Sequence, residues 1–488
     1  MNRTVLCGLA CAALLVSASC ATAASPEYAV KTEPKEKVSF LDRLKRDVPP
    51  LKNPRGKRWP MICWECVSFD PQGADVYRAL LERGLTQHIQ MNEKMIPTAK
   101  AIQDAGSPVI MMQGGGGPWP YDQAENWAHQ FDADYQAPKP GDWWESCRAC
   151  PAVFDGWRVN ADRLRVTLRK FKEAGVTVDA VWMDWEGEPL SAQGKEAWEN
   201  ARHCKRCRQT IPAAVIRDSA LWKPYCRRLY LELTGSYLAA PARDVFPACS
   251  VTNWMVVYST AERPVLGWSN GKVPPSAPMM FTATNPVAYG DTVFWQFWKA
   301  DWPLDRLHVD RFYTHLLLRE VSDDAANKRQ FGADKDCFPW VSRWCPDDED
   351  PKIPLISRPA YREALRHIWL RGADSMQIFQ PTRAGYEDIV FAEAADAVAV
   401  YDEMLAYARF LDEGEPMCLD VPDLQFDGVL WSGLRLPTEA VVRVIHQSEG
   451  SAKVTIEAWP GKTVELEADE NGRTYLLRLA DGQVKVQH

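Results

Sequence analysis

The feature that most constrains the fold is a long alternation of apolar segments with amphipathic ones. Apolar strands are expected at 58–67, 85–91 and 108–113, with helices between them at 75–84, 93–106 and 160–175. The expected helices end at glycines, the usual left-handed helix stops: Gly84, Gly106, Gly175 and, further on, Gly372. Strands that are apolar throughout and alternate with helices indicate a parallel sheet covered on both faces.

The alternation continues, less regularly, to about residue 411. Helices are expected at 225–246, 304–321, 358–372 and 386–411, and strands at 178–186, 248–259, 291–298, 338–344 and 375–381. About eight strand–helix units favour a (β/α)8 barrel over residues 56–414, with a doubly wound open sheet as the alternative.

The regions on either side of this barrel have a different character. From residue 415 apolar residues recur with period two between turn signals, so 415–488 is predicted to be a small, sandwich-like antiparallel β domain. Residues 24–55 are polar and rich in Lys and Pro, which indicates an arm or linker.

The amino terminus has the layout of a secretory leader. Arg3 precedes an apolar run from Val5 to Val16, and small residues then lead to a cleavage site after Ala23. Residues 1–23 are therefore predicted to be a signal peptide, and the protein to be periplasmic or extracellular. A lipid anchor at Cys20 is the alternative, and the only route to a membrane. The net charge of −8 and the lack of a basic stripe argue against nucleic-acid binding.

The segment at 178–189, VDAVWMDWEGEP, places carboxylates at the end of an apolar strand. Because strand side chains alternate, Trp182, Asp184 and Glu186 are expected to share the inward face. The carboxyl ends of barrel strands carry the active site. An ionised Asp184 beside Glu186 would raise the pKa of Glu186, which suits a general acid. The alternative is that these acids only cap a loop or pair with an arginine.

The segment resembles the Asp-Gly-x-Asp-x-Asp-x-Glu strand of chitinase-type glycoside hydrolases of family eighteen, and hyaluronidases carry a similar Asp-x-Glu. The resemblance implies that Glu186 is the acid and that Asp184 orients an N-acetyl group whose oxygen acts as nucleophile. Val109–Gly115 and Met255–Tyr258 are similar to two further strands of that family. The sequence therefore predicts a secreted glycoside hydrolase without a cofactor.

Tryptophans gather where strands should meet loops, and 21 occur in the chain. Indole faces stack on sugar rings, which favours a saccharide cleft, although a single Trp more often belongs to a core. The residues expected to contact a poly- or oligosaccharide are Tyr258, Trp119, Trp182, Trp254, Trp295 and Trp340.

Two departures from the chitinase pattern support a different function. Trp182 stands in place of the middle Asp, and Phe379 in place of the last strand's Trp. The alternative to an enzyme is a non-catalytic barrel that binds carbohydrate.

Cysteines form three C-x-x-C pairs, at 63/66, 147/150 and 204/207. An exported protein favours disulfides. Two such pairs also supply four thiolates, so a structural zinc at Cys147, Cys150, Cys204 and Cys207 is a second interpretation. A redox role for Cys63 and Cys66 is a third.

Overall fold

The protein is described by a computed structural model. It covers residues 25–32, 38–63, 73–113, 128–136, 150–183, 195–255, 281–283, 294, 298–331, 336–343, 353–378, 385–420 and 428–487. The predicted leader, 1–23, lies outside these residues, so its cleavage and the export of the protein stay predictions. Among the described helices, none is long and apolar enough to cross a bilayer.

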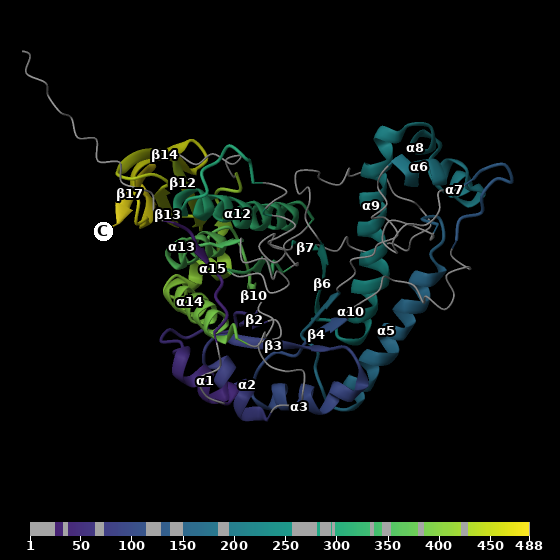
Figure 1. The fold of residues 1–488 in the computed structure, drawn as a ribbon, viewed down its shortest axis with the longest axis horizontal. Helices are drawn as coiled ribbons and strands as arrows, with labels where there is room; N and C mark the ends of the chain where they lie inside the picture. The colour runs from purple at the N-terminus through teal and green to yellow at the C-terminus, as the bar shows by residue number, and fades with distance from the viewer. Residues whose placement is uncertain are drawn as a thin grey trace, which may run out of the picture.

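Eight parallel strands form the centre of the molecule (Figure 1). In chain order they are β2 (Met61–Cys63), β3 (Leu85–Gln90), β4 (Ile110–Gln113), β5 (Ala180–Met183), β6 (Ser250–Met255), β7 (Phe281–Ala283), β8 (Trp340–Val341) and β10 (Gln377–Ile378). The order in the sheet is β7-β6-β5-β4-β3-β2-β10-β8. The last strand therefore pairs with the first, as in a (β/α)8 barrel. Within the described residues β7 and β8 are the two edges, so the sheet follows the barrel order without a closing pair.

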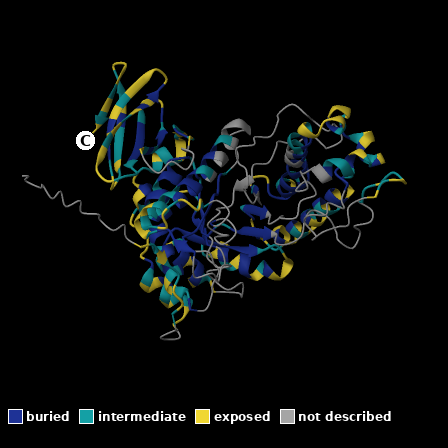
Figure 2. Ribbon diagram, turned by 45° about the horizontal axis from the view of Figure 1, so that its top comes forward, coloured by how far each residue is buried: buried dark blue, intermediate teal, exposed yellow. Residues whose placement is uncertain are grey.

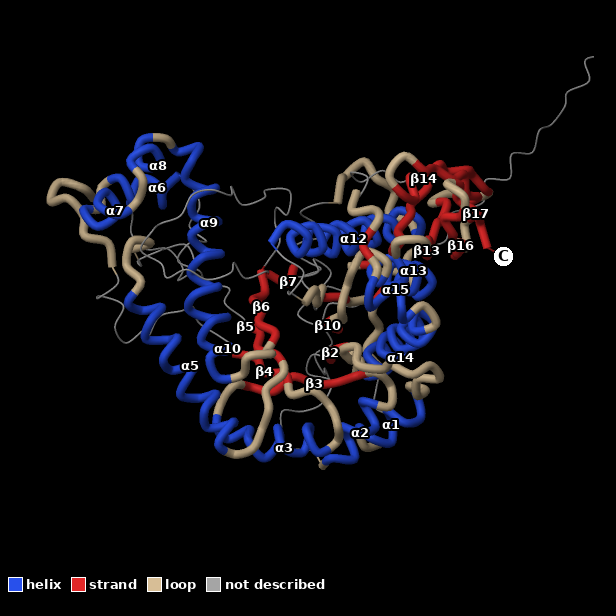
Figure 3. The backbone as a smooth tube through the Cα atoms, turned by 180° about the vertical axis from the view of Figure 1, so that it is seen from behind, coloured by secondary structure: helices blue, strands red, loops and turns tan. Residues whose placement is uncertain are grey.

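Helices cover the outside of this sheet (Figures 1 and 3). They are α2 (Ala74–Leu81), α3 (Ile96–Asp104), α5 (Asp155–Glu173), α9 (Trp222–Thr234), α10 (Ala240–Val245), α12 (Arg306–Phe331), α13 (Arg358–Trp369) and α14 (Glu387–Leu405). A π-helical turn, Gly235–Ala239, joins α9 to α10. Figure 2 shows the strands buried, while the exposed residues lie on the outer faces of the helices and on the carboxyl-terminal strands.

The alternation of strands and helices predicted from the sequence is present, but the sixth strand lies at a different place in the chain. The sixth strand was expected at 291–298, but β7 lies at Phe281–Ala283 and Phe294 has a helical backbone. Phe294 is fully buried between Trp298 and Phe312, with ring centroids 4.7 and 5.4 Å away. The described members of this apolar run, Phe294 and Trp298, thus pack against Phe312 on α12.

The arm at 24–55 packs against the body of the molecule. β1 (Glu27–Tyr28) pairs antiparallel with β9 (Pro354–Leu355). Further along, α1 (Phe40–Asp47) lies against α14, where the Phe40 and Phe391 rings are 5.6 Å apart. Polar contacts between Arg43 and Asp388, at the same junction, add to this docking.

Antiparallel strands make up the carboxyl-terminal part. A five-stranded sheet has the order β11 (Glu415–Pro416), β12 (Val429–Arg435), β13 (Glu439–His446), β16 (Arg473–Ala480) and β17 (Gln483–Gln487). A hairpin of β14 (Ser451–Trp459) and β15 (Lys462–Asp469) packs on it, and the two share an apolar core that includes Val442, Ile456 and Leu466.

A buried polar network joins α13 to this sheet. Arg443 on β13 donates two hydrogen bonds of 2.7 Å to Glu363. The fully buried Arg371 donates to the Ser432 hydroxyl at 2.8 Å and to the Trp431 carbonyl at 3.0 Å. Burial disfavours the charged form of Glu363, but hydrogen bonds from His367 and Arg443 outweigh it and lower the pKa of this carboxyl to about 2.

This lowered pKa predicts a pH dependence of stability. A carboxyl whose folded pKa lies below its unfolded value of 4.5 stabilises the fold above pH 4.5, by about 3 kcal/mol here. That contribution declines as the pH falls from about 5 toward 2. In thermal unfolding, the deficit of Glu363→Gln relative to wild type should shrink by more than half between pH 7 and pH 3. A constant deficit would contradict the ionised pair.

A second prediction concerns Gly84, the glycine that follows helix α2 and has a φ of +67°. A Cβ there would lie 2.9 Å from the Leu51 and Tyr401 side chains, whereas at Gly56, with φ +63°, nothing lies within 4 Å. Both alanine variants should lose about 1–2 kcal/mol to the left-handed backbone. Gly84→Ala should lose more, because of the contact, when denaturant midpoints are compared. Equal losses in the free energy of unfolding would mean that the Leu51 and Tyr401 side chains move aside without cost.

Candidate functional site

The inside of the parallel sheet is filled by apolar side chains. Ile62, Ile110, Met112, Ala180, Trp182, Phe338 and Trp340 form one buried cluster, with Trp59 packed on it. The Trp182 and Trp340 rings meet edge to face, with centroids 5.6 Å apart and planes at 88°. Each of these two residues is 1% exposed. The interior is therefore a packed core rather than a pore.

Strand parity places Trp182 on the inward face, as expected. Its neighbour Val181 belongs instead to the core between the sheet and the outer helices. On the register of the sheet, Trp182 lies beside Met112 on β4 and Thr252 on β6. Asp184 and Glu186 follow β5 directly in the sequence but lie outside the described residues.

A buried histidine lies against Trp182 inside the sheet. The His88 ring, on β3, approaches the indole edge to face at 5.4 Å. Complete burial lowers the pKa of His88 to about 3. The imidazole is therefore neutral at ordinary pH, which lets it pack in an apolar interior without the cost of a buried charge. The sequence indicates no role for His88, and it predicts Trp182 and Trp340 as sugar contacts rather than as members of this cluster.

Asp179, the first acid of the segment at 178–189, has a structural role. Its carboxylate accepts a hydrogen bond of 2.8 Å from the Val109 amide, and its own amide donates to the Val109 carbonyl at 2.9 Å. Burial raises the pKa of this carboxyl. These contacts join the amino ends of β4 and β5, at the edge opposite to the one where Asp184 follows.

The residues expected to bind sugar divide into two groups. Trp182 and Trp340 are enclosed by other side chains, and packing is the role that their contacts show. Trp254 lies on β6 with its side chain outside the described part, as do Trp119, Trp295 and Tyr258 as whole residues. Sugar contact by any of them stays a prediction.

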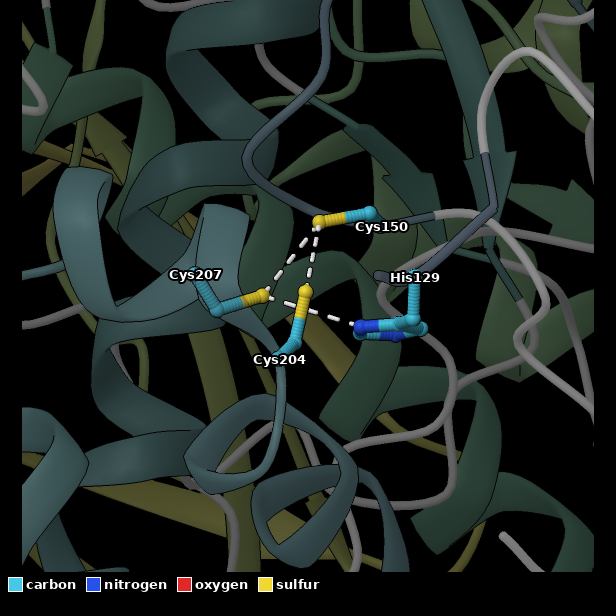
Figure 4. Close-up of side chains that lie close together, drawn as sticks. All are labelled: His129, Cys150, Cys204 and Cys207. Atoms are coloured by element: carbon cyan, nitrogen blue, oxygen red, sulfur yellow. Dashed lines mark hydrogen bonds between the residues drawn. The ribbon is translucent and has the colours of Figure 1, made fainter. Parts of the chain in front are cut away.

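A second candidate site lies away from the sheet, in three segments that converge (Figure 4). His129, Cys150, Cys204 and Cys207 each offer one ligand atom, and these atoms all lie within 4.8 Å of one another. Cys150 Sγ is 3.7 Å from Cys204 Sγ and 3.3 Å from Cys207 Sγ, and Cys207 Sγ is 3.7 Å from His129 Nδ1. The three cysteines are fully buried.

Contacts among the three sulfurs shift the pKa values of their thiols. Hydrogen bonds from Cys150 and Cys207 lower the pKa of Cys204, while the contact with Cys204 raises the pKa of Cys150 to about 12. Without a cation, one thiolate is stabilised here at the expense of the other two, since like charges at this range oppose each other. A divalent metal would let all three ionise together.

The disulfides expected from the sequence are absent among the described cysteines. No disulfide joins any of the described cysteines, which are Cys63, Cys150, Cys204, Cys207, Cys226, Cys249, Cys337 and Cys418. Within the pair 204/207 both sulfurs contact Cys150 instead, at distances well above the roughly 2.05 Å of an S–S bond. Cys66 and Cys147 lie outside the described residues. Three of the four thiols named for zinc therefore converge, and His129, which the sequence analysis missed, is the fourth described ligand.

Comparison with known families and curated proteins gives no match of any family model or curated sequence to this chain. Among solved structures, the chain is similar to glycoside hydrolases. The galactosidase domain of the alpha-galactosidase-sucrose kinase AgaSK has 9% sequence identity and a TM-score of 0.46, over 92% of this chain and 58% of that one.

The chain is also similar to the solved structures of two other glycoside hydrolases. The alpha-galactosidase AgaA of Geobacillus stearothermophilus in complex with raffinose has 8% identity and a TM-score of 0.46, over 90% of this chain and 57% of that one. The alpha-amylase of Geobacillus thermoleovorans complexed with acarbose has 11% identity and a TM-score of 0.39, over 88% of this chain and 99% of that one. The chain thus spans little more than half of the galactosidase structures. At TM-scores below 0.5, these likenesses carry no argument about its activity.

The packing around Trp182 generates a prediction. Trp182→Ala should leave a cavity in the sheet interior and lower the free energy of unfolding by about 3–5 kcal/mol. Chemical denaturation followed by far-UV circular dichroism measures the loss. Wild-type stability in this variant would contradict a packing role for the indole.

Proposed function

We propose that the protein hydrolyses glycosidic bonds, on a closed (β/α)8 barrel, with Glu186 as the general acid. The observation that carries the proposal is the place of β5 in the sheet. This strand lies between β4 and β6 in a sheet of eight parallel strands in barrel order, and it ends at Met183 with Asp184 next in the chain. The carboxyl edge of such a sheet is where barrel enzymes place their reacting groups.

The inward position of Trp182 supports the proposal for the acids. Residues two apart on a strand share a face, so a strand that continued past Met183 would turn Asp184 and Glu186 toward the barrel axis, about 6–7 Å apart. They would stand above the apolar layer of Trp182, Met112 and Trp340. A carboxyl over an apolar floor and near a second carboxylate keeps its proton to higher pH, as a proton donor requires.

The resemblance to chitinase-type hydrolases supplies a course for the reaction. Glu186 would donate its proton to the glycosidic oxygen as the bond to the anomeric carbon breaks. The acetamido oxygen of the substrate, held by Asp184, would form the new bond to that carbon. Water would then open this intermediate and return a proton to Glu186.

Substrate assistance would need no second enzymic carboxylate. In the seventh unit, Asp336 precedes β8 and so lies toward the amino edge, while Asp347 lies outside the described residues. This arrangement favours a substrate that carries an N-acetyl group, such as a chito-oligosaccharide or hyaluronan.

The test is Glu186→Gln, which keeps the shape of the side chain and removes the proton donor. It should lower kcat at least about 100-fold, because general acids contribute roughly 10²–10⁴ in rate. Reducing-end release would be measured on chito-oligosaccharides, hyaluronan, raffinose and malto-oligosaccharides. Glu188→Gln, two residues on, is the matched control and should retain turnover.

Three results would overturn parts of the proposal. Wild-type turnover in Glu186→Gln would exclude this residue as the acid. Cleavage of only the sugars without an acetamido group would exclude substrate assistance. Binding of any of these glycans without release of reducing ends by the wild-type protein would favour the non-catalytic carbohydrate-binding barrel instead.

A further inference from the structure

The cluster of His129 and three cysteines joins two separate connections of the parallel sheet. His129 and Cys150 lie between β4 and α5, whereas Cys204 and Cys207 lie between β5 and α9. Both connections leave the carboxyl edge of the sheet. They meet in a lobe of short helices at the far ends of α5 and α9, on the side of the molecule opposite to the carboxyl-terminal strands (Figure 1).

We propose that His129, Cys150, Cys204 and Cys207 bind one zinc ion, which fastens these two connections together. Zinc takes thiolate and imidazole ligands in a tetrahedron, with Zn–S near 2.3 Å, so bound sulfurs lie about 3.8 Å apart. The sulfur pairs here are separated by 3.7 and 3.3 Å, and Cys207 Sγ to His129 Nδ1 by 3.7 Å. The ligand atoms thus already surround a space of the right size.

The types of ligand atom in this cluster determine which metal ion it would bind. Three thiolates with one imidazole suit zinc, whereas calcium, magnesium and manganese prefer oxygen ligands. Four protein ligands fill the tetrahedron and leave no position for water or substrate. Such a closed site is structural rather than catalytic, and the inference stands whether or not the chain hydrolyses sugars.

The surroundings of the sulfurs fit bound thiolates. The Gln130 amide donates to Cys204 Sγ at 3.4 Å. His129 is itself held by its ring, which stacks on Phe131 at 5.1 Å. Such outer contacts orient metal ligands and stabilise their charge.

A metal ion would stabilise this lobe beyond what its short helices supply. Its helices, α6 (Lys195–Arg202), α7 (Lys205–Thr210) and α8 (Ala213–Arg217), are each far shorter than an isolated helix that is stable in water. The described residues of the two connections meet in hydrogen bonds from the Asp132 amide to the His203 carbonyl at 2.9 Å, from the Lys205 amide to the Gln130 carbonyl at 2.8 Å and from the Tyr135 hydroxyl to Asn200 Oδ1 at 2.9 Å. Phe131 bridges to Cys204, and Arg208 forms a forked pair with Asp132 at 2.7 and 2.8 Å. The Arg208 pair is exposed to solvent and contributes little.

A disulfide within this cluster would involve only two of its four residues. Bonding Cys150 to Cys207 requires the sulfurs to close from 3.3 Å to about 2.05 Å, and it leaves Cys204 and His129 without a role. The metal accounts for all four residues at the distances observed.

Metal analysis of the purified full-length protein tests the proposal. The protein, produced with zinc in the medium and without a histidine tag, should contain about one zinc per chain by plasma mass spectrometry. X-ray absorption should give three sulfur neighbours and one nitrogen. Cys207→Ser and His129→Ala should each lose most of the zinc. Cys249→Ser is the matched control: Cys249 is buried and free, and its thiol donates only to the Ser250 carbonyl at 3.3 Å, a bond that serine can make.

A second measurement covers the case in which a variant does not fold. Removing zinc from the wild-type protein with 1,10-phenanthroline should speed tryptic cleavage at Arg202, Arg206, Arg208 and Arg217, and added zinc should restore protection. Three outcomes would overturn the proposal. They are a zinc-free wild-type protein that takes up none, variants that keep the zinc of wild type, and a disulfide between Cys150 and Cys207 in protein prepared without reductant.

Discussion

The rest of the structure depends on how the inside of the parallel sheet is filled. Strands that curl around an axis must bury the side chains of their inner faces, and the two tryptophans of the inner cluster, Trp182 and Trp340, meet there edge to face. The neutral His88 completes the layer. The described side chains inside the sheet pack against one another, which leaves the carboxyl edge of the strands as the place where a ligand would be met. The long connections after β4 and β5 both leave that edge.

The connection after β5 carries both the proposed catalytic acids and two of the proposed metal ligands. Its first residues are Asp184 and Glu186, and its later part supplies Cys204 and Cys207 to the metal cluster. The connection after β4 supplies the other two ligands. A metal at that point would keep the far part of both connections in a fixed relation, without the large apolar core that a lobe of this size cannot build.

The sequence predicted the strand–helix order well, because apolar strands, amphipathic helices and glycine stops are local signals. Gly84, Gly106, Gly175 and Gly372 all have positive φ. Parity placed Trp182 inward correctly, for it needs only the strand period. What failed depends on contacts between distant segments. His129 gives no local sign of its cysteine partners, Phe294 is buried by its contact with Phe312 on α12, and the arm at 24–55 shows no pattern that reveals its partners near residues 354 and 391. The candidate acids follow a strand that was predicted correctly, but they lie outside the described residues.

The docking of the amino-terminal arm has a consequence for the order of folding. β1 pairs with β9, the Thr32 amide donates to the Gly385 carbonyl, and the Lys52 and Asn53 amides donate to Asp402. β2 likewise needs β10 as its neighbour. β1 and one edge of β2 therefore find their partners only late in the chain, and loops of about three hundred residues must close before these contacts form. A nascent chain that stops before β9 and β10 is not a smaller version of this protein. It is an intermediate whose first strand keeps an open edge, which a chaperone or another chain can pair with.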